Sequence, residues 1–188
     1  MISPQGLPNT KAQVTPAKPP VEKHMPHHIE TRLLPYSARQ MYDLVADVTR
    51  YPEFLPWTAA ARIRTRRPCP GGAPCEGGEV MEADLVISFK LFRERFGSRV
   101  TLLPDLAGGQ GRILTEYLDG PFKHLKSTWD FVDRPEGGCQ VTFDVDFEFR
   151  NVILAAVIGL VFNEAMTRVV RAFEARAKAL YTPLLPGA

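Results

Sequence analysis

Large apolar side chains coincide with turn signals in this sequence, and that combination points to binding chemistry. Phe54 and Trp57 lie on a segment that contains two prolines. Residues 89–92 place three large apolar side chains at the predicted end of a strand. Apolar groups at turns gate cavities or touch membrane surfaces, whereas core filling is the competing interpretation, which we favour for Phe96 and Trp129. The candidate set for an apolar ligand site is Phe54, Leu55, Trp57, Phe89, Leu91, Phe92, Phe96, Phe122 and Trp129.

The histidines and carboxylates do not combine into an acid/base or metal site. The four histidines are His24, His27, His28 and His124, and none is accompanied by a carboxylate cluster, so we expect surface positions. Asp144, Asp146 and Glu148 alternate along one strand and share its wet face. Catalytic carboxylates need a partly desolvated site, so we expect these to be solvated. No catalytic triad order or phosphate-binding glycine loop appears, and we predict that the protein is not an enzyme.

Three cysteines occur, Cys69, Cys75 and Cys139, and an odd number fits a reducing compartment. Cys69 and Cys75 close a loop rich in Gly and Pro, where a disulfide or a pair of metal ligands is conceivable. Their spacing differs from that of zinc knuckles, and no histidine or second cysteine pair lies near them. We therefore interpret them as two free thiols and predict no metal site.

The charge balance argues against a nucleic-acid binder. Lys plus Arg number 23 and Asp plus Glu number 21, for a net charge of +2. The first 24 residues contribute three lysines and one glutamate, so the remainder is neutral. A neutral domain lacks the basic footprint expected of a nucleic-acid-binding protein. A local run, Arg62, Arg64, Arg66 and Arg67, fits a contact with anionic lipid head groups or RNA, but a solvated strand face is the commoner explanation.

The elements that must position these residues follow from turn and periodicity signals. Residues 1–24 are Pro-rich and read as a disordered tail, residues 25–182 as one domain, and residues 183–188 as a flexible tail. The first strand is predicted at 27–34, and Ser37 with Gln40 forms a capping box that starts a helix over 38–48. A short helical turn follows at 51–56. Six further strands are predicted at 58–67, 79–89, 93–103, 111–118, 123–133 and 139–149.

The last strand and the helix after it define the fold class. Apolar and polar residues alternate strictly over 139–149, which is typical of an antiparallel sheet with one buried face. Asn151 is the predicted N-cap of a helix that reaches about residue 180. We predict an α+β fold, a curved seven-stranded antiparallel sheet around this long helix, with two short helices after strand 1. The gap between sheet and helix suits an apolar cavity, which Val157, Leu160 and Val161 complete.

The longest apolar run, residues 152–162, is 11 residues long, well below the ~20 needed to span a bilayer. We therefore expect a cytoplasmic protein that is at most peripheral to the inner membrane.

Several segments resemble a known family in order and spacing. They are residues 36–48 with 51–57, residues 89–100, residues 119–125 with Trp129, and residues 141–149 leading into the last helix. Over about residues 27–180 the chain is similar to the coenzyme Q-binding proteins of the START-like, helix-grip superfamily. The resemblance implies a cavity that takes a polyisoprenoid quinone, no catalytic step, and a role in respiratory electron transport. The chain departs from the family at Thr58, where Cys is frequent, and in the longer segment 68–78.

Three functions compete on this basis. The leading one is non-enzymatic binding of ubiquinone or a related prenyl lipid, as a carrier or chaperone and without a covalently bound cofactor. Tyr51, Trp57 and Arg95 are candidate donors to the quinone carbonyls. The alternative is a toxin-like protein that contacts the ribosome through the run Arg62–Arg67, since relatives on this fold are described as blocking ribosomal subunit association. A polyketide cyclase or dehydratase ranks last, because it needs acid/base groups inside the cavity.

Overall fold

The computed structural model describes residues 27–71, 75, 77–89, 91–105 and 108–184. The predicted N-terminal tail falls outside these residues. The strands are β1 (His27–Leu34), β2 (Thr58–Pro68), β3 (Glu79–Phe89), β4 (Phe92–Asp105), β5 (Gln110–Asp119), β6 (Phe122–Asp133) and β7 (Cys139–Phe149). The helices are α1 (Ala38–Ala46), a 3₁₀ turn (Val48–Arg50), α2 (Tyr51–Phe54) and α3 (Val152–Leu180).

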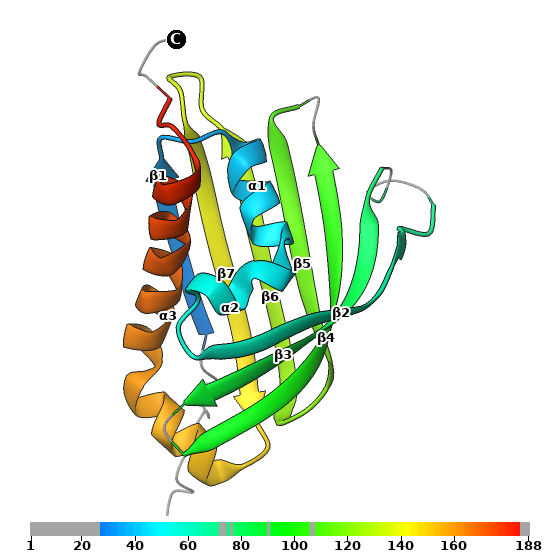
Figure 1. The fold of residues 1–188 in the computed structure, drawn as a ribbon, viewed down its shortest axis with the longest axis vertical. Helices are drawn as coiled ribbons and strands as arrows, with labels where there is room; N and C mark the ends of the chain where they lie inside the picture. Colours follow the sequence, from blue (N-terminus) through cyan, green and yellow to red (C-terminus); the bar gives the residue numbers. More distant parts are fainter. Residues whose placement is uncertain (1–26, 72–74, 76, 90, 106–107, 185–188) are drawn as a thin grey trace, which may run out of the picture.

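The seven strands form one antiparallel sheet in the order β1-β7-β6-β5-β4-β3-β2. The sheet curves strongly, and β2 and β3 sweep across the lower part of the molecule (Figure 1). Helix α3 contacts β1, β7, α1 and α2, and it fills the hollow of the sheet together with the short helices. The predicted fold class is confirmed.

Local capping interactions explain where the helices begin. The hydroxyl of Ser37 accepts from the amide of Gln40 at 3.1 Å, while the Gln40 side chain accepts from the amide of Ser37 at 2.9 Å. At the start of α3, Asn151 accepts from the amides of Ile153 and Leu154 at 2.8 and 3.2 Å. Each side chain satisfies amides that have no partner inside the helix. Both predicted caps are therefore confirmed.

The strict alternation along β7 produces the expected division between core and solvent. Its buried residues are Cys139, Val141, Phe143, Val145 and Phe147. On the other face, Asp144 lies 2.8 Å from His27 and Asp146 lies 3.3 Å from His124. The acidic residues thus lie on the face of β7 opposite the core, as the sequence predicted.

The surface position predicted for His28 is wrong. Its ring is half-buried on the side of β1 that faces α3, 6.2 Å from the ring of Phe162, and its Nε2 lies 3.1 Å from a Glu30 oxygen. Alternation along β1 turns His28 inward and His27 outward, so two adjacent histidines have different surroundings.

The loop between β2 and β3 also corrects a prediction. Cys69 and Cys75 form a disulfide, with Cα atoms 5.6 Å apart, and are not free thiols. Two backbone hydrogen bonds hold the loop ends together: Cys69 donates to Gly78, and Gly78 donates to Cys75, both at 2.9 Å. This separation lies within the range that a disulfide bridges.

Beyond α3, the amide of Leu184 donates to the carbonyl of Pro35 at 2.7 Å, so the chain after the helix lies against the turn that follows β1. The remainder of the predicted C-terminal tail is outside the described residues. In the part of the chain that the structure describes, no helix has the length and apolarity needed to cross a membrane. Nor do three His, Cys, Asp or Glu side chains come together there in a group suited to a metal ion.

Candidate functional site

An apolar cavity of about 280 Å³ lies between the concave face of the sheet and α3. Strands β3 to β7 supply its floor, and α3 closes it through Val161, Ala165 and Val169. The short helices contribute Val45, Val48 and Tyr51. No Asp, Glu, Lys, Arg or His is among the described residues that line it. Because an unpaired buried charge is costly, such a cavity suits an uncharged, mostly apolar molecule.

Seven of the twelve predicted ligand-site residues line this cavity: Leu55, Trp57, Phe89, Phe96, Phe122, Trp129 and Val161. Phe54 is not a lining residue, but its ring packs against the lining residue Phe173, with the ring centroids 5.2 Å apart. Phe92 and Val157 are half-buried and outside the lining. The ligand-binding role of the twelve stays a prediction.

Two of the predicted positions point to solvent instead. Leu91 is 98% exposed in the turn between β3 and β4, and Leu160 is 88% exposed on α3. On a helix, residues four apart share a face, so Val161 and Ala165 face the cavity while Leu160 is rotated by about 100° from Val161. Leu160 and Leu91 therefore lie outside the cavity lining, and their predicted place at the cavity or its rim stays a prediction.

Trp57 occupies an unusual backbone conformation at the cavity wall. Its φ is +61°, in the left-handed region, which costs a non-glycine residue about 1–3 kcal/mol. The indole meets the ring of Phe89 edge-on, with centroids 5.2 Å apart. The carbonyl of Trp57 accepts from the amide of Ser88 at 2.8 Å. These contacts hold the strained residue, so the indole is fixed against the ligand space.

Two of the three predicted hydrogen-bond donors are not free for a ligand. The hydroxyl of Tyr51 donates to the carbonyl of Val45 at 2.6 Å, and burial raises the pKa of this phenol far above its usual value. Arg95 lies on the outer face of the sheet, where it donates to Asp84 and Asp119. Only Trp57 remains from that prediction.

Four Ser or Thr residues line the cavity: Thr58, Ser98, Thr115 and Ser127. Sequence reasoning noted Thr58 only as a departure from the family and missed the other three. Ser98 is only 2% exposed. The available signal was the period of two along β4, β5 and β6, which places each of them on the same face as apolar neighbours. A search for Ser or Thr at the strand positions that face the core would have identified these residues.

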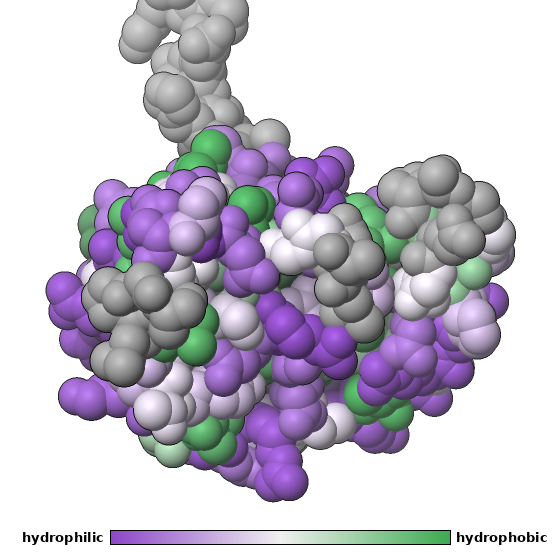
Figure 2. All heavy atoms as spheres, turned by 90° about the horizontal axis from the view of Figure 1, so that it is seen from above, coloured by the Kyte–Doolittle hydropathy of each residue, from purple (hydrophilic) through white to green (hydrophobic). Residues whose placement is uncertain are grey.

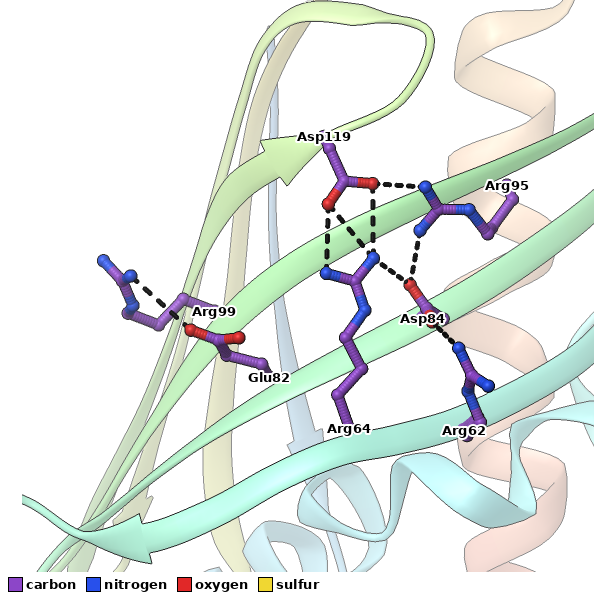
Figure 3. A network of polar contacts seen from close by, with 7 residues as sticks. All are labelled: Arg62, Arg64, Glu82, Asp84, Arg95, Arg99 and Asp119. Carbon is purple, nitrogen blue, oxygen red and sulfur yellow. Dashed lines mark hydrogen bonds and ion pairs between the residues drawn. The ribbon is translucent and has the colours of Figure 1, made fainter.

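The outer face of β2 to β5 carries an ion-pair network (Figure 3). Asp84, 4% exposed, accepts from Arg62 and Arg95 at 2.6 Å and lies 2.5 Å from Arg64. Hydrogen bonds from Arg64 first, then from Arg62 and Arg95, hold the pKa of Asp84 well below its usual range. Asp119 accepts from Arg64 at 3.0 Å and from Arg95 at 2.5 Å. Much of the basic run is thus neutralised within the protein.

Exposed apolar side chains gather on the first half of α3, where Val152, Ile153 and Leu160 face solvent. This half of the helix lies at the lower end of the molecule in Figure 1. At the opposite end, the described surface is mainly hydrophilic with scattered hydrophobic residues (Figure 2). The two ends therefore differ in their suitability for an apolar contact.

Comparison with known proteins gives the family. The model of the family described as polyketide cyclase/dehydrase and lipid transport matches residues 34–174. Over 149 residues the chain is 38% identical to the ribosome association toxin RatA of Rickettsia prowazekii, which covers 79% of this chain and 93% of that relative. Over 157 residues it is 31% identical to the mitochondrial coenzyme Q-binding protein COQ10 homolog B of Xenopus laevis, covering 81% of this chain and 58% of that relative.

Among solved structures, a START superfamily protein from Mycobacterium smegmatis superposes with a TM-score of 0.62. It is 18% identical, and the match covers 82% of this chain and 99% of that one, so the likeness concerns the fold. These similarities confirm the START-like resemblance predicted from the sequence. The chain therefore belongs to the polyketide cyclase/dehydrase and lipid transport family.

Proposed function

We propose that the protein binds an uncharged prenyl lipid, ubiquinone or a related quinone, in its cavity and performs no chemistry on it. The observation that carries this proposal is the cavity itself, whose described lining is apolar and free of charged side chains. A cyclase or dehydratase would need a general acid or base in the cavity, and no Asp, Glu, His, Lys or Cys is among the described lining residues. The proposed role is that of a carrier or chaperone.

The size of the cavity limits how much of the ligand it holds. At about 280 Å³ it lies near the lower end of ligand pockets, which span roughly 300–1,000 Å³. That volume suits a quinone ring and the first part of a tail, with each buried methylene worth ~0.8 kcal/mol before ordering costs. The rest of a long polyprenyl tail would stay outside. The exposed Val152, Ile153 and Leu160 on α3 supply a surface for peripheral membrane contact.

The experiment is organic extraction of the purified protein and mass spectrometry of the bound lipid. Ala165→Phe fills the cavity from α3, since Ala165 is buried and lines it. Ala156→Phe is the matched control, because Ala156 is exposed on the same helix. We expect ubiquinone with the wild type and the control, and little with Ala165→Phe. Equal lipid content in both folded variants would count against the proposal.

Ribosome contact is a second candidate, favoured by the 38% identity to the Rickettsia prowazekii relative and by that protein's name. On this chain the contact would involve the exposed Arg62, Arg66 and Arg67 of β2. Co-sedimentation with ribosomes tests it, with these arginines changed to Gln and Arg168→Gln on α3 as a control of equal charge loss per site. Sedimentation that is absent, or unaffected by the β2 changes, would exclude this surface.

A further inference from the structure

We propose that Ser98, Thr115 and Ser127 form a polar subsite that receives the carbonyl oxygens of the cavity ligand. The inference rests on the proposed function and deepens it, since it names the ligand class and the residues that orient the molecule. No comparison with a known protein assigns these hydroxyls a role.

Strand register brings the three residues together. Thr115 on β5 lies directly opposite Ser127 on β6, and Ser98 on β4 lies opposite Tyr117, two residues along β5 from Thr115. On one face of an antiparallel pair, directly opposite Cβ atoms are about 5 Å apart and diagonal neighbours about 7–8 Å. All three residues line the cavity, so Thr115 and Ser127 can share one acceptor and Ser98 can reach a second acceptor of the same ligand.

The hydroxyls lack partners within the described part of the chain. Ser98 is 98% buried, and no hydrogen bond joins its side chain, or those of Thr115 and Ser127, to another described residue. The hydroxyl of Tyr117, which faces Ser98 across the strand pair, is also buried without a partner. Ser98 is buried, whereas Thr115 and Ser127 are half-buried and line the cavity. A hydroxyl that faces the cavity without a protein partner is open to water or to a polar group of a ligand.

The chemistry of the subsite selects among lipids. A hydroxyl donates to a carbonyl oxygen at no cost in charge, whereas a carboxylate or phosphate would need a cation, and the described lining has none. The ligand class is therefore a neutral molecule with a carbonyl on an apolar body, as in a quinone. The ring would lie against β4 to β6, and its tail would run towards Val161 and Ala165 of α3.

The alternation of β4 places Ser98 in the cavity wall. Phe96, Ser98 and Val100 all line the cavity, as expected for every second residue of a strand. The register shift next to Ser98 adds a residue to β5, and it places Asp119 opposite Gly97. A Cβ at Gly97 would lie 2.7 Å from the Arg64 guanidinium and 2.8 Å from the Asp119 carboxylate, so the ion-pair network lies directly over this position on the outer face.

The test compares two probes with the same tail, decylbenzoquinone and decylbenzene, by isothermal titration calorimetry. We expect the wild type to bind the quinone about tenfold more tightly, as for one or two net hydrogen bonds. The variant Ser98→Ala/Thr115→Val/Ser127→Ala should bind decylbenzene as before and lose the preference for the quinone. Thr31→Val, which removes an exposed hydroxyl on β1, should keep it.

Each other result is informative. A wild type that binds both probes equally, or a triple variant that keeps the preference, overturns the inference and leaves the proposed function standing. A wild type that binds neither probe overturns the proposed function as well. If the triple variant does not fold, Thr115→Val alone serves, because valine has nearly the shape of threonine, and we expect about a threefold loss of preference.

Discussion

The strongest stability prediction concerns Asp84→Asn, which removes a negative charge from beneath three guanidinium groups. Asp84 lies on the outer face of β3 and is contacted by Arg62, Arg64 and Arg95 from the strands on either side. Asparagine keeps the shape, but it is neutral and offers one acceptor oxygen in place of two. Arg64 and Arg95 would then keep only Asp119 as a counter-charge, and Arg62 would lose its ion pair.

The magnitude follows from burial. Hydrogen bonds to a charged group contribute about 1.5–3 kcal/mol each when they are well shielded. Here the carboxylate is buried but Arg62 and Arg95 are substantially exposed, so solvent screens their share and the three contributions do not add in full. We expect a loss of about 3 kcal/mol, which for a chain of this size lowers Tm by roughly 6–12 °C.

Urea unfolding followed by tryptophan fluorescence at several pH values measures this loss. The pKa of Asp84 is lowered on folding, so its contribution is complete above the unfolded value of about 3.9 and disappears as the pH falls below it. The difference between wild type and Asp84→Asn should therefore be constant from pH 5 to 8 and shrink below pH 4. Asp130→Asn, which breaks the exposed pair with Arg112, is the control and should cost about 0–1 kcal/mol.

Two results would refute the reasoning. If Asp84→Asn costs no more than Asp130→Asn, the network contributes no more than an ordinary surface ion pair. If the difference persists unchanged at pH 3, the loss comes from packing and not from the charge of Asp84.

Two further predictions concern the core and the thiols. Phe173→Ala should cost about 3–5 kcal/mol in urea unfolding, because this buried ring packs on Tyr51, Phe54 and Trp129; a cost below 1 kcal/mol would contradict that packing. Burial raises the pKa of the Cys139 thiol to about 12, so at pH 8 it should react with a disulfide reagent only after unfolding. Rapid labelling of the native protein that Cys139→Ser abolishes would show that the thiol is accessible.

The fold could be predicted because each local signal agreed with the global arrangement. The alternation over 139–149 gave the buried face of β7, and Ser37 and Asn151 gave the starts of two helices. The predicted end of α1 was less accurate: the helix stops at Ala46, and residues 48–50 continue as a 3₁₀ turn. A change from one helical hydrogen-bond pattern to another leaves little trace in composition.

The site was predicted less well than the fold, for geometric reasons. Hydrophobicity alone selected Leu160, but the helical phase of α3, which places Val161 and not Leu160 inside, depends on where the sheet lies. Arg95 was chosen for its chemistry. The alternation of β4, however, places Arg95 on the outer face of the sheet, whereas Ser98 of the same strand lies on the inner face. Serines and threonines in strands are common, so Ser98 had no distinguishing signal until the register showed what it faces.

Ser98, Thr115 and Ser127 contribute both to the space and to the polarity of the cavity. Their neighbours on the inner face include large residues such as Ile113, Trp129 and Phe143, and a similar side chain at Ser98 or Ser127 would fill part of the gap. Valine would fill the space of Thr115 equally well without a hydroxyl that faces an apolar cavity, so core packing alone gives no reason for threonine there. The subsite that we propose gives such a reason.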